Sequence, residues 1–577
     1  MASVSLIIDI APSGAVDVGR DHRHEKQVTG TRSYLLATFI GLFLAGSAFA
    51  QTTYYVSEMG NDRNDGLSEG TPWQSLSRVS RERLEPGDTV RFRSGDLFEG
   101  QLVISNSGTE EAPITFTRYG AGDKPLLDAG NPRRGAHVAT VLIEDQDQLV
   151  ISELKIRNFR KRARDGIDDG DAFGILIRNS GRRALTGYEL SRLEIDEVYP
   201  IKRRRMFNRN TVSGIRFETS PAQTVKRAFN TSNIYIHDNV IRRSGRFGIA
   251  IRHRPSDVGG VRGTPLDFDE NVRIINNLCE DLGGSCVLLN GVKGGLLESN
   301  TFLRSGSLTN QNVSVTRGSG AWFFRSRDIV AQFNAAIGSR GHNDSSGLHV
   351  DFGNKNVLVQ YNFFYDNEGY GTEILGKNDN VIWRYNVSVG DGTRVARVDR
   401  PEGIKSEFPG KTIFVSDFAA PKRLPSSNIH IYNNTYVTFP DSAPQVEING
   451  ENVALRNNAF IATPDSRIGS RVLVVWNDDN GSIISNNLFS GAVAPALIAM
   501  DDAPHLSVLA MDVSATSLEA FAIPSDFTGE PIVHPPFPAA GKGVFSHITE
   551  IPKVDIFGNL IAQDAPVIGA GTASESP

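Results

Sequence analysis

A short segment that recurs along the middle of the chain constrains the fold more than any other feature. Each copy alternates apolar with other residues, and the spacings between successive copies are 38, 23, 34, 28, 24, 48 and 24 residues. Alternation is the period of a β-strand, and self-similarity at this interval indicates a solenoid, so helical repeat arrays are excluded. The copies are NIYIHDN at 233, NVRIINN at 271, GGLLESN at 294, DIVAQFN at 328, NVLVQYN at 356, NVIWRYN at 380, NIHIYNN at 428 and NVALRNN at 452.

A minimum repeat of 23 to 24 residues with asparagine at a fixed corner predicts an all-β fold, the right-handed parallel β-helix. Asparagine suits a corner because its amide can bond the backbone, stack on the asparagine of the next coil and tolerate a left-handed φ. We expect residues 51–500 to form the solenoid with inserted loops, with parallel stacking from about residue 85. The apolar, Pro-rich residues 501–577 are expected to cap its open end.

The N-terminal residues 1–50 read as an extension followed by a secretory signal. Arg32 precedes an apolar run that ends in Ala48-Phe49-Ala50, a cleavage site before Gln51. The run is shorter than a membrane-spanning helix requires, so we expect export to the periplasm or the medium without stable membrane insertion. The polar residues before the run are unusual for a signal, and translation starting at Val28 would explain them.

The chain has two cysteines, Cys279 and Cys286, and a formal net charge of -6. An oxidising compartment permits a disulfide between the two, and a pair of buried, unbonded thiols is the alternative. The modest net charge gives no indication of nucleic acid as a partner.

The two ends of the solenoid resemble a known group of proteins. The stretches YYVSEMGNDRNDGLSEGTPWQSL at 54, EPGDTVRF at 85, APITFTRYG at 112 and DIFGNLIAQDAPVIGAG at 555 are similar to the opening and closing segments of secreted right-handed parallel β-helix proteins of the pectate-lyase-like superfamily. The resemblance implies the fold and export. It does not imply one reaction, because the superfamily includes lyases, hydrolases, epimerases and binding proteins.

In several coils a glycine precedes a short strand whose first and third residues are apolar and therefore point inward, so that the second, fourth and sixth face outward. Stacked coils then give three outward columns. The first is Leu176, Arg216, Ala250, Cys286, Trp322, His349 and Glu373; the second is Arg178, Glu218, Arg252, Leu288, Phe324, Asp351 and Leu375; the third is Arg254, Asn290, Ser326, Gly353 and Lys377.

The next coil has two possible alignments. If Gly392 begins its strand, Arg394 joins the first column beside Glu373, and we favour this placement. The alternative puts the strand at residues 412–417 and leaves Arg394 in a loop.

Upstream of the ionisable residues, the columns predict a substrate-binding strip. Arg178, Arg216, Arg252 and Arg254 would attract an acidic polysaccharide, although a solvated face of arginines is the simpler interpretation. Trp322 and Phe324 would stack on sugar rings, or else pack under the loop of residues 305–318.

The ionisable residues predict cleavage of a uronate polymer by β-elimination, which needs a cation, a base and an acid. Asp351 and Glu373, with Asp344 from the preceding loop, are candidate Ca²⁺ ligands, because this ion prefers oxygen. The candidate base is Lys377 or His349. Arg394 could bind the sugar carboxylate bidentately.

The run GTEILGKNDNVIWRYN at 371 resembles the alginate lyase and chondroitinase B group. The resemblance implies that Glu373 is a metal ligand and Lys377 the base. Two departures weaken it: the separation of four residues is one fewer than in that group, and Gly371 replaces the second upstream glutamate.

Together these observations predict a monomeric, exported polysaccharide lyase acting on an acidic polysaccharide. The alternative is a glycoside hydrolase in which Asp351 and Glu373 are paired carboxylates on neighbouring strands. A C5-epimerase shares the proton abstraction. A polysaccharide-binding or adhesin β-helix without activity would use the same residues as a salt-linked patch.

Overall fold

The computed structural model describes most of the predicted solenoid. The described residues are 51–130, 136–161, 170–201, 212–220, 229–253, 268–308, 317–341, 343–394, 409–419, 422–439, 445–462, 467–468, 481–490, 492–493, 560 and 570. The predicted signal at 1–50 and nearly all of the predicted cap at 501–577 lie outside them. Within the described part, no helix is both long and apolar enough to cross a membrane.

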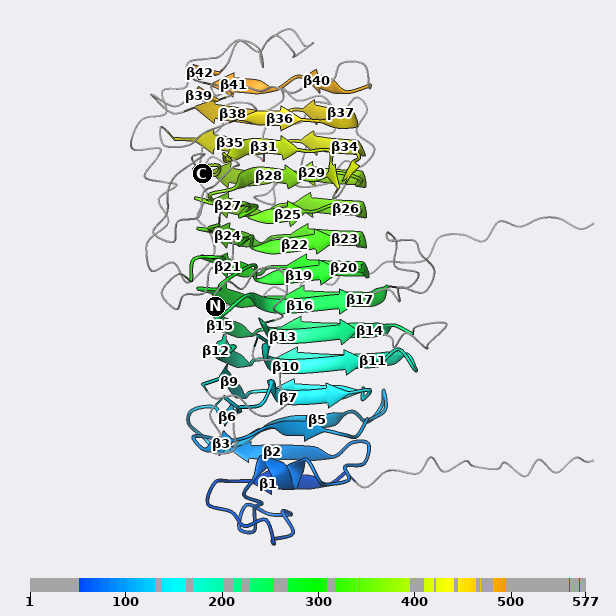
Figure 1. The fold of residues 1–577 in the computed structure, drawn as a ribbon, viewed down its shortest axis with the longest axis vertical. Coiled ribbons are helices and arrows are strands. Elements are labelled where there is room, and N and C mark those ends of the chain that lie inside the picture. The colour runs from blue at the N-terminus through cyan, green and yellow to red at the C-terminus, as the bar shows by residue number, and fades with distance from the viewer. Residues whose placement is uncertain are drawn as a thin grey trace, which may run out of the picture. The chain divides into compact units, whose positions relative to one another are not determined.

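The described chain is a right-handed parallel β-helix, as the repeat predicts. Each full coil gives one strand to each of three parallel sheets, here named sheets A, B and C in the order in which the chain visits them, and Figure 1 shows the coils stacked from β1 to β42. A short helix, α1 (Leu76–Val79), follows the first strand, and the Ser75 hydroxyl caps it by accepting from the Arg78 N–H.

Sheet A runs through fourteen strands of the described residues, in one continuous parallel order. They are β1 (Thr53–Val56), β2 (Thr89–Arg93), β5 (Ile114–Tyr119), β8 (Leu149–Ser152), β11 (Leu185–Ser191), β14 (Thr231–His237), β17 (Asp269–Ile275), β20 (Val292–Glu298), β23 (Arg327–Gln332), β26 (Lys355–Gln360), β29 (Asp379–Arg384), β34 (Ser426–Tyr432), β37 (Gly450–Arg456) and β40 (Ile483–Ser485).

Sheet B follows sheet A after a sharp corner and has thirteen described strands. They are β3 (Leu97–Glu99), β6 (Leu126–Asp128), β9 (Lys155–Phe159), β12 (Glu194–Tyr199), β15 (Val240–Ser244), β18 (Leu278–Glu280), β21 (Thr301–Leu303), β24 (Ala335–Ile337), β27 (Phe363–Tyr365), β30 (Val387–Val389), β35 (Thr435–Thr438), β38 (Ala459–Ala462) and β41 (Leu488–Ser490).

Sheet C carries the predicted site and has eleven strands within the described ranges. They are β4 (Leu102–Ile104), β7 (Ala139–Glu144), β10 (Ala172–Asn179), β13 (Val212–Thr219), β16 (Phe247–His253), β19 (Val287–Asn290), β22 (Ala321–Phe324), β25 (Leu348–Val350), β28 (Tyr370–Ile374), β31 (Lys411–Val415) and β36 (Val446–Ile448). Two small pairs complete the described strands, β32 (Phe418–Ala419) with β33 (Lys422–Arg423) and β39 (Arg467–Ile468) with β42 (Ala492–Val493).

The core consists of inward side chains that repeat from coil to coil. In sheet A, Val357, Val381 and Ile429 lie in register on successive strands, and each is at most 1% exposed. Burying an aliphatic side chain of this size stabilises the fold by about 1.5–3 kcal/mol. The same register that aligns these residues inside also aligns the outward positions between them.

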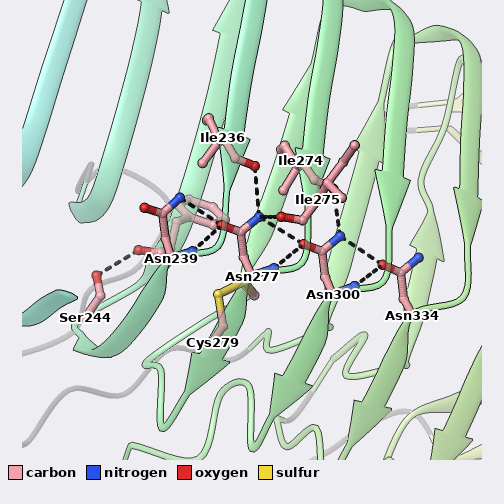
Figure 2. Close-up of a disulfide and its surroundings, with 11 residues drawn as sticks. Ile236, Asn239, Ser244, Ile274, Ile275, Asn277, Cys279, Asn300 and Asn334 are labelled. Carbon is pink, nitrogen blue, oxygen red and sulfur yellow. Dashed lines mark hydrogen bonds between the residues drawn. A yellow bond between two sulfur atoms is a disulfide. The ribbon is translucent and has the colours of Figure 1, made fainter. Parts of the chain in front are cut away.

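The corner between sheets A and B carries a ladder of buried asparagines, part of which Figure 2 shows. Nδ2 of Asn277 donates to Oδ1 of Asn300 at 3.0 Å, and Oδ1 of Asn277 accepts from the backbone N–H and Nδ2 of Asn239 at 3.1 and 2.9 Å. Each amide therefore bonds the coils on both sides of it. The described members of this ladder are Asn239, Asn277, Asn300, Asn334, Asn362, Asn386, Asn434, Asn458 and Asn487.

The left-handed backbone conformation at this corner falls one residue before the ladder asparagine. Asp238, Asn276, Phe333 and Tyr361 have φ of 55°, 53°, 56° and 56°. The hydrogen bonding predicted for the corner asparagine is confirmed in this ladder. The left-handed φ is confirmed at the asparagine that opens the repeat segment, as at Asn233, Asn271 and Asn356 with φ of 52°, 51° and 55°, whereas at the ladder corner it falls on the preceding residue.

The two cysteines form a disulfide. Cys279 lies in β18 and Cys286 just before β19, with Cα atoms 5.9 Å apart. The alternative of two unbonded thiols is therefore excluded. Gly248 makes room for the bridge, because a Cβ at this position would lie 2.8 Å from Sγ of Cys279.

Candidate active site

The outward columns of sheet C have largely the predicted register. Trp322 pairs with His349, and the pairing of Val350 with Ile374 places His349 level with Glu373. The prediction was wrong for one coil. The residue that precedes Trp322 in the first column is Leu288, not Cys286. The reason is that Cys286 precedes β19 and is drawn into the disulfide, so the outward positions of this coil shift by two residues.

The favoured alignment of Arg394 is also wrong. Glu373 pairs with Phe414, so the strand after β28 is β31, and Arg394 lies in the connection before it. Arg394 nevertheless reaches the site, because its Nη1 donates to the backbone carbonyl oxygen of Asp344 at 2.8 Å. A loop residue thus arrives beside the column without belonging to a strand.

The predicted cationic strip contains carboxylates at alternate positions. In register, Glu144 is followed by Arg178, Glu218 and Arg252. The guanidinium of Arg178 lies 3.1 Å from the Glu144 carboxylate. A column of alternating charges offers a polyanion less attraction than four adjacent arginines would.

The other two arginines of the strip differ in position. Arg216 lies on the first column, with a fully buried side chain whose Nη2 is 3.5 Å from a Glu218 oxygen. Arg254 lies outside the described residues. Substrate binding by these arginines therefore stays a prediction, with less support than the sequence suggested.

His349 stands at the centre of three carboxylates. Its Nε2 lies 3.5 Å from Oε1 of Glu373 and 4.0 Å from Oδ1 of Asp351, and its Nδ1 lies 4.0 Å from Oδ2 of Asp344. The imidazole is 1% exposed, and among the described residues its Nε2 has no hydrogen-bond partner. The predicted cluster of ionisable groups is therefore present, and most of it is buried.

Asp344 lies in a strained turn. Both Asp344 and Ser345 have positive φ, 52° and 76°, although neither is glycine. Such conformations cost about 1–3 kcal/mol each and occur mainly where the surroundings impose them, often at functional sites. Here Arg394 holds the carbonyl oxygen of Asp344, and the Gly369 N–H donates to the carbonyl oxygen of Ser345 at 3.0 Å.

Glu373 is held from its other side by Ser346. The Ser346 hydroxyl donates to Oε2 of Glu373, and both side chains are buried. Sequence reasoning missed Ser346, although it directly precedes Gly347 and the strand that carries His349. Gly371 lets this coil stack closely, because a Cβ there would lie 2.7 Å from the carbonyl oxygen of Thr412.

Asp351 accepts hydrogen bonds on both oxygens, from the Trp322 indole N–H at 2.7 Å and from the Phe352 backbone N–H at 2.8 Å. The indole also stacks parallel to the His349 ring, with centroids 5.7 Å apart. Phe324 packs edge-on against Phe352. Trp322 and Phe324 are both half-buried, so each retains surface for a ligand.

Burial dominates the electrostatics of the cluster. It raises the pKa of Glu373 to about 7, with the charge of Asp344 adding to the effect and that of His349 opposing it. Burial also raises the pKa of Asp351, again against the attraction of His349. Burial by itself would lower the pKa of His349, but the combined attraction of the three carboxylates outweighs it and the pKa is raised.

The cluster does not match the donor set that Ca²⁺ prefers. One ligand atom each from Asp344, His349 and Glu373 lie within 4.8 Å of one another. Calcium takes six to eight oxygen ligands, whereas here an imidazole stands at the centre. The indole and the serine hydroxyl described above already occupy carboxylate oxygens. Calcium binding by Asp344, Asp351 and Glu373 stays an untested prediction that this donor set does not favour.

Lys377 lies beyond the end of β28 at an exposed corner. Its φ is 59°, and its backbone N–H donates to the carbonyl oxygen of Leu424 at 2.8 Å. Among the described residues, no ion pair joins Lys377 to Glu373 or Asp351. The structure therefore keeps Lys377 at the rim, apart from the carboxylates that surround His349.

A group of four residues on β28 and the two strands that follow it in sheet C was not predicted. Phe414 follows Glu373 in the column and is followed by Glu447. Nζ of Lys411 lies 3.5 Å from a Glu447 oxygen and 4.1 Å from the Phe414 ring centroid, and the Tyr370 ring stacks on Phe414 at 4.7 Å. The segment KTIF, residues 411–414, contains Lys411 and Phe414 in the alternation of a strand. The favoured alignment missed it because it started the strand of this coil at Gly392.

No family model matches this chain. A curated lacto-N-biosidase of Bifidobacterium longum subsp. longum is 26% identical over 489 residues, which cover 71% of this chain and 29% of that protein. The chain thus spans less than a third of the length of the curated relative that it matches.

Two crystal structures of the GH136 lacto-N-biosidase from Eubacterium ramulus, the selenomethionine derivative and the native protein, each match with a TM-score of 0.51. They are 24% and 22% identical and cover 71% and 77% of this chain and 67% and 68% of those chains. At this identity the structural likeness establishes the fold alone.

These comparisons overturn the predicted reaction. The curated relative is a lacto-N-biosidase, which is a glycoside hydrolase, so the prediction of a polysaccharide lyase is contradicted. A PL6 alginate lyase, AlyGC, matches with a TM-score of only 0.45 at 14% identity and carries no weight for the reaction. The findings support a carbohydrate-degrading enzyme, and they favour the hydrolase alternative.

Proposed function

We propose that this chain is a glycoside hydrolase that uses carboxyl groups of the His349 cluster. The observation that carries the proposal is the gathering of Asp344, Asp351 and Glu373 around one imidazole on the outward face of sheet C. Glycoside hydrolysis needs one carboxyl group as the acid and a second as the nucleophile or base. The similarity to a lacto-N-biosidase supports hydrolysis.

Asp351 is the proposed general acid. Burial raises its pKa, which favours the protonated form that must donate to the departing oxygen. Its side chain is 7% exposed and is oriented by the Trp322 indole and the Phe352 backbone N–H, and each oxygen that accepts one of these bonds keeps a second lone pair for the acidic proton.

Asp344 is the proposed nucleophile or base. Its side chain is 16% exposed, more than those of Asp351 at 7% and Glu373 at 1%, so a sugar can reach it most easily. Nε of Arg317 lies 3.4 Å from Oδ2 of Asp344. The two proposed carboxyl groups thus differ in exposure and in their closest partner, a guanidinium for Asp344 and an indole N–H for Asp351.

Glu373 is the proposed positioning residue of this arrangement. It is fully buried, its Oε2 accepts from Ser346, and its Oε1 faces His349. It therefore orients the imidazole that contacts both of the other carboxylates. The sequence suggested Asp351 and Glu373 as the pair of catalytic carboxylates. Asp344 takes the place of Glu373 in the proposed pair because the Glu373 side chain is buried.

The test incubates the mature chain with neutral and uronate-containing oligosaccharides and polymers, including a lacto-N-biosidase substrate, and follows new reducing ends. We expect Asp344→Asn and Asp351→Asn each to lower kcat by about 10³-fold. Added azide should restore cleavage to the nucleophile variant if the reaction retains configuration. Rescue of Glu373→Ala, but not of Asp344→Ala, would assign the nucleophile to Glu373.

We also propose export to an oxidising compartment, supported by the Cys279–Cys286 disulfide. N-terminal sequencing of the exported chain should find Gln51 first. An N-terminus upstream of residue 50 on the exported protein would contradict the predicted cleavage.

A further inference from the structure

The first outward column of sheet C continues past the carboxylates to a second aromatic residue. In order along the stack, the column reads Trp322, His349, Glu373, Phe414 and Glu447. The two central members are buried, whereas Trp322 and Phe414 are half-buried. Two partly exposed aromatic rings therefore lie on opposite sides of the proposed cleavage site.

The spacing of these rings sets the size of a ligand that would touch both. Three strand spacings separate them, about 14 Å at the usual distance between parallel strands. This span is longer than one sugar ring. A ligand that contacts both aromatic residues must therefore be an oligosaccharide that crosses the strands along the axis of the stack.

The surroundings of Phe414 add polar recognition to its apolar face. Lys411 and Glu447 hold an ammonium and a carboxylate 3.5 Å apart, with the ammonium over this ring at 4.1 Å from its centroid, and the Lys411 side chain is 6% exposed. The Tyr370 ring stacks on Phe414 and fixes its orientation. An ammonium donates and a carboxylate accepts, so the pair can bind two neighbouring hydroxyl groups of one sugar.

We infer that Phe414 and the Lys411–Glu447 pair form a subsite for an uncharged sugar ring, on the side of the carboxylates opposite to Trp322. The inference rests on the proposed hydrolase function and deepens it. The Lys411–Glu447 pair has no net charge to attract a sugar carboxylate or sulfate, and the more exposed member, Glu447 at 26% against 6%, would repel one. The substrate is therefore a glycan with a neutral residue next to the scissile bond on this side.

The test uses the mature chain and a series of neutral oligosaccharides from disaccharide to pentasaccharide, with matched oligosaccharides that carry a uronate. We expect Phe414→Ala to raise KM by about fivefold for the longer neutral glycans and to leave the shortest unchanged, since one aromatic contact is worth about 1 kcal/mol. Phe333→Ala is the control, because Phe333 is an exposed aromatic residue at the corner between sheets A and B, away from the site.

A second variant keeps the test informative if Phe414→Ala folds poorly. Glu447→Gln retains the shape of the side chain and removes its charge, so it should improve binding of the uronate glycans relative to the neutral ones. Binding is measured by calorimetry in the Asp351→Asn background, which separates it from cleavage.

The outcomes distinguish the subsite from the proposed function. Cleavage of the long neutral glycans with equal KM in Phe414→Ala and Phe333→Ala would overturn the subsite alone. Binding that depends on Phe414 without any cleavage by the unmodified chain would keep the subsite and overturn the hydrolase. A chain that neither binds nor cleaves any glycan in the series would overturn both.

Discussion

The corner between sheets A and B and the outward face of sheet C are built on the same coils but follow opposite rules. At the corner the same residue recurs, and Asn362 uses its amide to bond the coils on both sides and its own. On the face of sheet C each coil contributes a different residue, and the carboxylates there crowd around His349.

The difference separates stability from function in this molecule. Buried polar groups that are fully hydrogen-bonded, as at the corner, hold the fold together. Buried charged groups that face one another, as on sheet C, contribute little or oppose folding and persist where chemistry requires them. Substitutions in the two regions should therefore affect different measurements.

The largest expected effect is on activity at the site. Asp351→Asn should lower kcat by about 10³-fold, because the proposed acid is lost. The free energy of unfolding should change by less than about 1 kcal/mol, since the shape is kept and a buried charge is removed. Kinetics and urea unfolding of the same preparation measure both. Full activity with reduced stability would assign Asp351 to the fold.

The corner should show the reverse. Asn362→Ala should lower the free energy of unfolding by about 3 kcal/mol, because it leaves the amide of Asn334 and the carbonyl groups of Ala331 and Gln360 without their partner. The kcat of the folded fraction should not change. The matched control is Asn356→Gly, which removes an exposed amide at a position with φ of 55° and should cost less than about 1 kcal/mol.

The Cys279–Cys286 disulfide occurs once in the described coils, and removing it tests how much it contributes to stability. Replacing Cys279 and Cys286 together by serine should lower the free energy of unfolding by about 2 kcal/mol, because the bridge closes only a short loop. Activity should be retained. Thermal unfolding with and without a reductant provides the same comparison in the unmodified chain, and a reductant that removes activity at low temperature would link the bridge to the site.

The smallest expected effect is the pH dependence that the site imposes on stability. The folded pKa of Glu373 is raised to about 7 and that of His349 is also raised, so both groups bind protons more tightly in the folded chain. The contribution of Glu373 is complete at low pH and is lost as pH rises from about 4.5 through about 7, whereas that of His349 is lost only above about 6.5. Glu373→Gln should remove the part of this decline that falls between pH 4.5 and about 7. An unchanged pH dependence in urea unfolding of this variant would contradict the raised pKa.

The sequence was a good guide where one residue type repeats. Eight copies of an alternating segment predicted the parallel β-helix, and the glycines before the strands of sheet C predicted that Trp322, His349 and Glu373 share an outward column. Periodicity specifies the direction of a side chain because each coil repeats the backbone of the last. The same reasoning failed at Cys286 and Arg394, where a disulfide and a long insertion interrupt the period.

The chain by itself determined the solenoid, its Asn corner and which ionisable residues face outward. Only the tertiary structure decided that Ser346 bonds Glu373, that Arg394 enters from a loop to hold Asp344, and that Phe414 follows Glu373. Burial and charge pairing depend on neighbours in space, and insertions of variable length change which residues become neighbours. The alternation along each strand predicts whether a side chain points inward or outward. The residues that it contacts are supplied by the coils above and below.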